Sequence, residues 1–562
     1  MTRSLLVYLP GYPYAAETLT PQHMLAAMAG ALMDAGHETQ ILDFGVVEEL
    51  GTLTSGRLAN ALLGASAADL WEERAGVCSR WTARRRRRTL TRMIRAAEAR
   101  QWATTAAELG THTGLDFIVL HVPRREDVAP ALALASIVRA ASPSIRILAS
   151  GRHAERYASF VIEAAPAIDA CIVGDVEPAI IAVADHVRAP ETWSGLPNLV
   201  IRDGARAFAT PREEVLRLDG LPRPSYRREV YPALYHGGKF RLFPVRESRG
   251  SDHLPHATPR PPFEAFQARV RSPRKVCDEL RGLGRDCGAR AFHFLGDATP
   301  AATFDALCYE ILAECLHVFY SRSAHVHDTD PTTLSTLHAS GCRAVSFRID
   351  TGSQRLLEDY YGHEFGVTQI ETVLSACREA NLFTVAAFTY PCPEDDYHAR
   401  AETLRLVRRA RPHAVRLGLP EVLPDSDWWD FAREFGFKID ARAVARLATT
   451  APDPFATPGA DLAYAMKGRS AAAVGQEHTG LLDDFRFEGF ATAVSVHEAL
   501  LARVCGRHDA EAEYAERLRE LLFLGDAEEL AAAVRAFNDR AVAPANTIPF
   551  VPYATVRAAV GN

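Results

Sequence analysis

Short apolar runs alternate with helical stretches along the first 190 residues. The first run, residues 4–9, ends in Pro10-Gly11-Tyr12-Pro13, and a helical pattern from Pro21 to Ala35 is closed by Gly36. Further apolar runs cover residues 38–42, 116–122, 145–149 and 170–173. Alternation of this kind predicts parallel βαβ units. We therefore predict a doubly wound (Rossmann-like) domain over residues 1–190, with its ligand at the carboxyl ends of the strands.

A second series of apolar runs begins after a Pro-rich stretch, residues 191–240, which we interpret as a linker on the surface of its neighbours. The runs lie near residues 241–247, 291–296, 317–326, 343–350, 384–390 and 414–419. Helical patterns such as 272–284 and 367–380 separate them. Six strand–helix repeats predict a partial TIM barrel, (β/α)6, over 241–440, with functional loops at the strand carboxyl ends.

The remaining chain is predicted to be mainly helical. Residues 441–562 read as a helical C-terminal domain, especially 497–507 and 510–535, before an extended tail around 548–552. Residues 52–110 interrupt the first domain as a helical insertion. It carries the arginine run Arg84 to Arg88, which we interpret as a solvated helix face rather than a contact for an anionic partner. The predicted fold class is therefore α/β throughout residues 1–440.

Composition narrows the function classes. The 562 residues are 48% hydrophobic and 24% charged, with a net charge of −7, typical of a soluble globular protein and not of a nucleic-acid binder. No apolar run approaches the length of a membrane span, and the N-terminus lacks the features of a signal peptide. Ten cysteines occur without any CxxC pair. We therefore expect a cytoplasmic protein with mostly inert thiols and no membrane partner.

Several segments, in order, carry a resemblance to one family. In the first domain they are LLVYLPGYP, LAAMAGALMDAGHETQILD, ILASGRHAE and DACIVGDVE. LPNLVIRDG and LDGLPRPSY follow, and the barrel region contributes SRG at 248–250, RSPRKVCDEL, AFHFLGDATP and GCRAVSFRIDTGSQRLL. Over residues 4–440 the chain resembles the cobalamin-binding class of the radical S-adenosylmethionine (SAM) superfamily. The resemblance implies a cobalamin-binding domain followed by a barrel of the radical SAM type.

The chain departs from that family where its iron–sulfur cluster is held. The family pattern after SRG is CxxxCxxC, but the three positions here are Ser251, Pro255 and Thr258. Thiolates hold such clusters as soft anionic donors, whereas two hydroxyls are hard and neutral and proline has no donor. We predict no iron–sulfur cluster and no radical formed through one. A replacement metal on His253 and His256, with His293 and His325 nearby, is the less favoured interpretation, and we predict no metal ligands.

The resemblance implies cobalamin in loops at the strand ends of the first domain. Glycines at strand ends let a backbone approach a ligand closely, although they are common in any doubly wound fold. The family's DxHxxG motif is absent, because His121 has no Asp two residues before it, so cobalt without a histidine ligand is expected. The predicted cobalamin residues are Gly11, Tyr12, Tyr14, His121, Ser150, Gly151, Arg152, His153, Gly174 and Glu177.

The resemblance also implies a SAM site at the strand ends of the barrel. The Gly296 loop would lie beside the SAM amino group, and Asp350 would accept a ribose hydroxyl, with Gln354 and His325 as neighbours. Asp350 alternatively caps the helix that follows Thr351.

The predicted function is cobalamin-dependent polar chemistry, such as methyl transfer from cobalt to a small molecule or natural-product intermediate, with SAM restoring the methyl group. Glu247 and Asp297 are the predicted bases. A cobalamin-dependent rearrangement or cyclisation, a pseudoenzyme that senses cobalamin or partners an enzyme, and a SAM- or nucleotide-binding enzyme without cobalamin remain alternatives. Residues predicted to face the substrate are Tyr12, Tyr14, Arg246, Glu247, Arg249, Asp297, Arg348, Asp350 and Tyr390.

Overall fold

The computed structural model describes most of the chain. The described residues are 1–54, 57–63, 77–109, 112, 114–251, 255–257, 268–296, 299–506 and 510–542. His253, Thr258, Asp297 and the predicted extended tail lie outside them.

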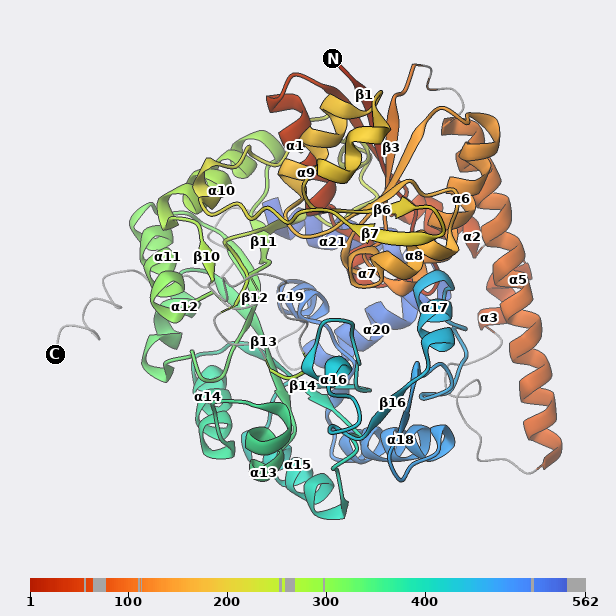
Figure 1. Cartoon of the computed structure of the whole chain (residues 1–562). Coiled ribbons are helices and arrows are strands. Elements are labelled where there is room, and N and C mark those ends of the chain that lie inside the picture. The colour runs from red at the N-terminus through yellow and green to blue at the C-terminus, as the bar shows by residue number, and fades with distance from the viewer. Residues whose placement is uncertain are drawn as a thin grey trace.

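The N-terminal region is built on a seven-stranded sheet in the order β2-β1-β3-β4-β5-β6-β7 (Figure 1). The strands are β1 (Arg3–Tyr8), β2 (Glu38–Asp43), β3 (Phe117–His121), β4 (Arg146–Ser150), β5 (Ala170–Ile172), β6 (Leu199–Asp203) and β7 (Arg206–Ala209). β1 to β5 pair in parallel, whereas β6 and β7 join antiparallel. The expectation of a surface linker from residue 191 is therefore wrong for β6 and β7. Their short hairpin turns at Gly204, whose φ of 59° favours glycine, and continues the sheet.

Helices cover both faces of this sheet. They are α1 (His23–Asp34), α6 (Val128–Ala141), α7 (Arg152–Arg156), α8 (Ala158–Ala164) and α9 (Val176–His186), with short 3-10 helices η1 (Ala16–Leu19), η2 (Arg125–Asp127) and η3 (Pro190–Gly195). Alternate strand residues explain the layers. Leu6 and Tyr8 pack with α1 and α9, whereas Leu5 and Val7 pack with α6 and α8.

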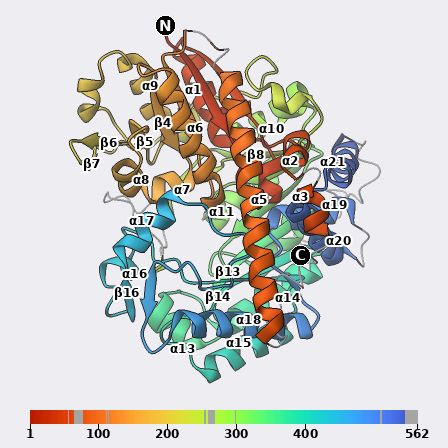
Figure 2. The ribbon, with the colours of Figure 1, turned by 90° about the vertical axis from the view of Figure 1, so that its right-hand side faces the viewer.

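The helical insertion contains α2 (Val47–Leu53), α3 (Arg57–Leu63) and the long α5 (Val77–Leu109). In Figure 2, α5 runs along one side of the molecule from the first domain past the barrel. Arg85, Arg86 and Arg88 are exposed on it, consistent with a solvated face.

The second region is an open, all-parallel sheet of seven strands in the order β18-β15-β14-β13-β12-β11-β8. The strands are β8 (Leu242–Val245), β11 (Ala291–Phe294), β12 (Phe319–Ala324), β13 (Cys342–Asp350), β14 (Phe383–Thr389), β15 (Ala414–Gly418) and β18 (Ala491–Thr492). Its outer helices are α10 (Pro273–Cys287), α11 (Ala301–Ala313), α12 (Leu334–Ala339), α13 (Gln354–Leu356), α14 (Val367–Glu379) and α15 (Tyr397–Ala410). Six strands match the predicted runs, and β18 adds a seventh.

The C-terminal region supplies α16 (Asp427–Asp430), α17 (Ala441–Thr449), α18 (Ala471–Phe487), α19 (Val496–Cys505), α20 (Glu511–Leu524) and α21 (Ala527–Val542), with the hairpin β16 (Phe437–Ile439) and β17 (Tyr464–Met466). The helix expected over 510–535 is two helices, because Gly525 adopts a left-handed φ of 65° that ends the first. α19 lies against β12, β13 and β14.

The element types confirm the predicted α/β fold class. None of the helices in the described part of the chain is long and apolar enough to cross a membrane.

Candidate functional site

The inner face of the barrel changes from apolar and closed to polar and open along its strands. Near the strand starts, Ala344, Phe383 and Ala414 are buried against the C-terminal helices. Two to four residues further on, the same face carries Arg348, whose side chain is 41% exposed, and Arg416, which is also exposed. Barrel enzymes place their reacting groups at these carboxyl ends. The open upper part of the inner face is therefore the candidate active site.

Asp350 is the centre of a buried polar network at the end of β13. Its carboxylate accepts hydrogen bonds from His363 Nε2 (2.9 Å), Thr389 Oγ1 (2.7 Å) and Arg348 Nε (2.9 Å). Burial alone would raise the pKa of Asp350, but Arg348 and His363 hold the pKa below its usual value. Asp350 also adopts a left-handed φ of 66°, which is uncommon for a residue with a side chain. The carboxylate thus neither caps the next helix nor faces open space, and it orients Arg348.

Glu247 is buried beside the loop that follows β11. It accepts the backbone N–H of Gly296 (3.0 Å) and the hydroxyl of Thr299 (2.9 Å). A Cβ at Gly296 would lie within 2.5 Å of Glu247 and closer still to Ser248 and Thr299, so this glycine serves the protein's own packing. Burial raises the pKa of Glu247. Its hydrogen bonds assign it to holding the loop in place.

A second polar cluster joins all three regions of the chain inside the barrel. Glu17 of η1 lies beside His497 of α19, with Oε1 3.1 Å from Nδ1. The ring of His497 lies 4.0 Å from that of His293 on β11, and His293 Nδ1 is 2.9 Å from Ser321 Oγ on β12. Burial alone would raise the pKa of Glu17, but His497 lowers it, whereas burial lowers the pKa of His293. Arg416 also lowers the pKa of Glu17, so the cluster borders the open inner face.

The predicted cobalamin loops of the first sheet are mostly closed. His121 is buried with its Nδ1 3.4 Å from Ser150 Oγ, and His153 Nε2 is 3.3 Å from the carbonyl of Ala448 in α17. Burial lowers the pKa of His121 to about 3 and that of His153 to about 4. α17 packs on α8 and α6 and adds Val444 and Ala448 to the core of this domain. Of the predicted cobalamin residues, only Arg152 and Gly174 are exposed.

Two of the predicted glycines are required by the protein itself. A Cβ at Gly11 would lie 1.8 Å from the carbonyl oxygen of Glu126, and one at Gly151 would lie 2.7 Å from the backbone of Val122. Tyr12 and Tyr14 are buried among the C-terminal and insertion helices, where the Tyr12 hydroxyl donates to the Phe523 carbonyl (2.5 Å). These loops therefore approach other protein segments closely.

An ion cluster links the first sheet to the barrel. The loop that carries Ser251, Pro255 and Thr258 in place of the family's cysteines is called the altered loop below. Arg249, beside this loop, donates to Asp175 (2.7 Å) and to both carboxylate oxygens of Glu177 (2.6 and 2.9 Å). Arg269, on the other stem of that loop, donates to Asp175 (2.5 Å). β9 (Ser248–Arg249) and β10 (Arg269–Val270) pair antiparallel, so both stems are attached to the carboxyl end of β5. Glu177 and Arg249 thus serve domain orientation in this structure.

The described part of the altered loop is packed into the protein. Pro255 and Ala257 are buried, and Ala257 belongs to a core with Trp428 and Tyr361. His256 Nδ1 lies 2.6 Å from Asp427 of α16, and its backbone carbonyl accepts the N–H of Trp428. His256 therefore anchors α16. Among the described residues, no group of three His, Cys, Asp or Glu side chains is arranged to hold a metal ion.

The other predicted site residues have diverse surroundings. Gln354 is exposed and its Oε1 accepts the N–H of Val367 (2.8 Å) at the start of α14. His325 is partly buried with its ring 5.4 Å from His327. Tyr390 is buried after β14, and Arg246 is partly buried after β8. The structure thus brings Arg348 and Asp350 together at the open inner face and keeps Gln354 outside it.

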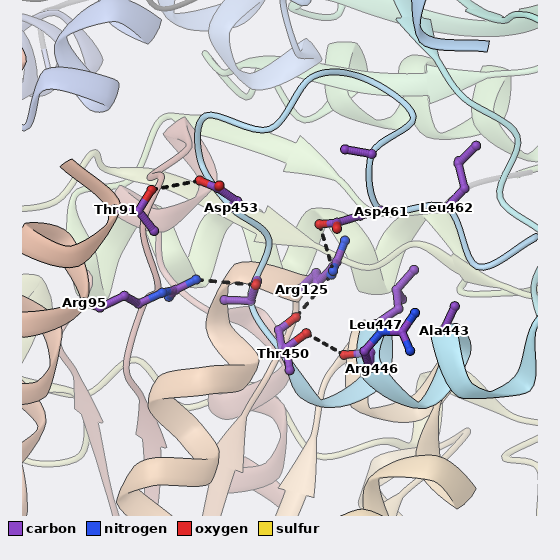
Figure 3. Close-up of a pocket in the computed structure, with 12 residues that line it drawn as sticks. Thr91, Arg95, Arg125, Ala443, Arg446, Leu447, Thr450, Asp453, Asp461 and Leu462 are labelled. Atoms are coloured by element: carbon purple, nitrogen blue, oxygen red, sulfur yellow. Dashed lines mark hydrogen bonds and ion pairs between the residues drawn. The ribbon is translucent and has the colours of Figure 1, made fainter. Parts of the chain in front are cut away.

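A separate cavity of about 290 Å³ lies between α5, η2, α17 and the segment after it (Figure 3). Its charged groups are largely engaged with one another. Arg125 pairs with Asp461 (3.3 Å) and donates to the Thr450 carbonyl, and Thr91 donates to Asp453 (3.1 Å). The cavity therefore joins the insertion, the first domain and the C-terminal region.

Glu17, Arg416 and His497 were not singled out in the sequence. They lie on three distant segments, and no local motif connects them. Of the three, only Arg416 could have been noticed in the sequence, because it is a charged residue inside a predicted buried strand.

Comparisons with known proteins place the fold. No protein-family model matches the chain. It is 21% identical over 316 residues to an uncharacterized methyltransferase of Pyrococcus horikoshii, covering 54% of this chain and 66% of that protein. It is 25% identical over 278 residues to the anaerobic magnesium-protoporphyrin IX monomethyl ester cyclase of Cereibacter sphaeroides, covering 47% of this chain and 44% of that protein. The match thus spans about two thirds of the methyltransferase and less than half of the cyclase.

Solved structures align over far more of the chain. The radical SAM methyltransferase TsrM of Kitasatospora setae, with cobalamin and a [4Fe-4S] cluster bound, matches with a TM-score of 0.62 at 14% identity, covering 95% of this chain and 100% of that one. The cobalamin-dependent SAM radical enzyme OxsB, with aqua-cobalamin and SAM bound, matches with a TM-score of 0.58 at 10% identity, covering 100% of this chain and 81% of that one. The sequence resemblance is confirmed at the level of the fold: this chain has the architecture of cobalamin-dependent radical SAM enzymes.

Proposed function

We propose that this protein is a cobalamin-dependent transferase that moves a methyl group by polar chemistry, with SAM as the methyl source and a small molecule or natural-product intermediate as the acceptor. The observation that carries this proposal is the pairing of an open, charged barrel face with an altered loop that lacks thiolates. The fold likeness to a methyltransferase and the methyltransferase relative support the reaction class.

The altered loop does not fit an iron–sulfur cluster. Pro255 stands at one ligand position and is buried, with no side-chain atom to offer a metal. Ser251 and Thr258 would offer only neutral oxygens to iron. No step of the proposed reaction therefore uses an electron from a cluster.

The exposed part of the carboxyl edge of the first sheet is the part that could contact cobalamin. Arg152 and Gly174 are exposed at the carboxyl ends of β4 and β5, and the Gly174 N–H donates to Glu155 (2.7 Å). These two residues would contact the cofactor. His121 and His153 are buried and engaged, which favours cobalt without a histidine from these loops. When bound, cobalamin accepts and donates a methyl group.

Glu17 and His497 are the groups that would handle the acceptor's proton. A histidine paired with a carboxylate is suited to accept a proton from an attacking nucleophile, because the carboxylate stabilises the resulting imidazolium. Glu17 remains ionised because its pKa is lowered. Both side chains are partly exposed beside Arg416. We therefore propose these two residues as the base in place of Glu247, whose carboxylate holds the loop after β11.

The test uses the full chain purified with cobalamin supplied, reduced chemically to Co(I) and incubated with methyl-labelled SAM. We expect a cobalamin spectrum and label on cobalt, retained in His497→Gln because that side chain acts on the acceptor. Bound cobalamin without label would contradict methyl transfer and favour a sensor or a rearrangement. Protein without cobalamin, or with iron and acid-labile sulfide in equal amounts, would overturn the proposal.

A further inference from the structure

The strand register places two arginines in one row on the inner face of the barrel. Arg348 of β13 is paired with Ala387 of β14, and Ala387 is paired with Arg416 of β15. Parallel neighbours in register are separated by about 4.8 Å, so the two arginine Cα atoms lie roughly 10 Å apart. The side chain between them is a single methyl group. The two guanidinium groups can therefore reach over Ala387 toward one ligand.

The direction of the row follows from the alternation of each strand. Ala344 and Ala414, an even number of residues before the two arginines, pack inward in the core that contains α19. Phe347, Ile349 and Val415 pack in the core on the other side of the sheet. Arg348 and Arg416 hence project from the inner face, and Ala387 is only partly buried between them.

The two arginines are held differently. Arg348 Nε donates to buried Asp350 (2.9 Å), which is fixed in turn by His363 and Thr389. Arg348 is therefore oriented before any ligand arrives. Arg416 is exposed and makes no hydrogen bond or ion pair with the described residues, and its influence reaches Glu17 only as a charge that lowers the pKa of that carboxyl.

The carboxylates that the structure describes near the two arginines are engaged with other groups. Glu17 pairs with His497, Asp350 is shared among three donors, and Glu421, near Arg348, pairs with Arg156 of α7 (3.0 Å). Two like charges in one row of an accessible inner face favour an anion between them. Guanidinium groups bind carboxylate and phosphate oxygens through paired N–H donors.

We infer that Arg348 and Arg416 form an oxyanion-binding pair that holds a carboxylate or phosphate group of the acceptor molecule over Ala387. The inference rests on the proposed function only in assigning the anion to the acceptor. It defines the acceptor class as small molecules that carry such a group, and it places that group within reach of the Glu17–His497 pair. Binding is measured without turnover, so its failure is separable from failure of methyl transfer.

The experiment is calorimetric titration of the full chain at low ionic strength with glutarate, with inorganic phosphate and with uncharged glutaramide. We expect glutarate or phosphate to bind and glutaramide not to bind. Arg416→Gln should lower the affinity for the anion by about tenfold or more, because one charge-assisted hydrogen-bonding group is lost. Ala387→Leu should weaken it without changing any charge, because the larger side chain fills the space between the arginines.

Arg405→Gln is the matched control, because Arg405 is exposed on the outer helix α15. It should bind the anions as the unaltered chain does, and all three variants should keep the unaltered thermal midpoint. Equal binding of glutarate and glutaramide, or equal weakening by Arg405→Gln, would overturn the inference. If SAM displaces the anion, its methionine carboxylate shares the pair and the assignment to the acceptor is wrong. Label transfer to cobalt by the unaltered chain, measured separately, would leave the proposed function intact whether or not the anions bind.

Discussion

The two parallel sheets of this protein end in opposite ways. At the carboxyl edge of the first sheet, Ser150 is fully buried and His121 and His153 are covered by the chain itself. At the carboxyl edge of the barrel sheet, Arg348 and Arg416 are accessible on the inner face. At these edges both sheets are built from parallel strands, and both were expected to present ligands there. The difference teaches that topology locates a rim, whereas the elements packed over it decide whether the rim is open.

The covering elements differ in how far they reach. α17 extends over the first sheet as far as the loop after β4, and Ala448 contacts His153. α19 enters the barrel beside β12 to β14, and the apolar cluster that contains α19 ends on this face at the row of Val385 and Ala414. Above that row the inner face is charged. The covered part of the first edge is therefore expected to respond to substitutions through stability, and its exposed Arg152 and the open barrel face through binding.

Arg249→Met should have the largest effect, because Glu177 would remain buried without its cation, whereas Asp175 keeps Arg269. Leaving buried charges unpaired costs about 3–5 kcal/mol. Thermal unfolding should show a midpoint lowered by several degrees. Arg285→Met is the control, since Arg285 pairs with Asp286 on the surface, and its midpoint should not change. Equal midpoints for the two variants would mean that the ion cluster does not hold the first sheet to the barrel.

Gly11→Ala tests whether the first-sheet loops are closed. The new Cβ would lie 1.8 Å from the Glu126 carbonyl, so the loop must shift, at a cost of about 3 kcal/mol. Gly220→Ala is the matched control, because no atom lies within 4 Å of its added Cβ and its φ is not left-handed. Urea unfolding followed by circular dichroism compares them. If Gly11→Ala unfolds at the same urea concentration as Gly220→Ala, the loop has room for a ligand.

Asp395→Asn tests whether a carboxylate at the barrel rim is buried, as the residues of the closed edge are, so that it affects stability. Asp395 follows β14 and accepts the N–H of Cys392 (2.6 Å), and burial raises its pKa to about 7. The folded protein therefore binds a proton that the unfolded chain releases near pH 4, so stability falls as pH rises through 7. The loss between pH 5 and pH 7 is about 2 kcal/mol. Asn accepts the same N–H without titrating.

Unfolding midpoints measured from pH 5 to pH 7.5 should therefore fall more steeply for the unaltered chain than for Asp395→Asn. Parallel curves would show that Asp395 is ionised throughout and that the rim is open around it. Asp396→Asn, at an exposed helix start where the Ala399 N–H is accepted, is the control and should keep the unaltered slope.

Much of the fold was predictable because the length and spacing of apolar residues depend directly on whether a segment is a strand or a helix. The strands at 38–43, 117–121 and 146–150, and the helix at 367–379, match their predicted runs within a residue or two. β6 and β7 were missed because their Pro-rich surroundings resemble a linker. The division of 510–542 into two helices depends on Gly525, which an apolar period does not reveal.

The site was less predictable because its members belong to separate segments. Arg348 and Asp350 share a strand, and both were selected from the sequence. Glu17, His293 and His497 come from three regions and meet only where η1 lies between the start of β8 and α19. The spacing of these three residues in the sequence does not predict that they lie together.

The sequence by itself determined the two parallel sheets, their order along the chain and the replacement of three thiolate positions by Ser251, Pro255 and Thr258, because these depend on residue type and local period. Only the tertiary structure decided that Gly11 and Gly151 serve backbone packing, that Glu177 pairs with Arg249, and that Arg348 and Arg416 share one open row. The physical reason is that burial and charge pairing arise between segments distant in sequence, and local periodicity contains no record of which segments will cover one another.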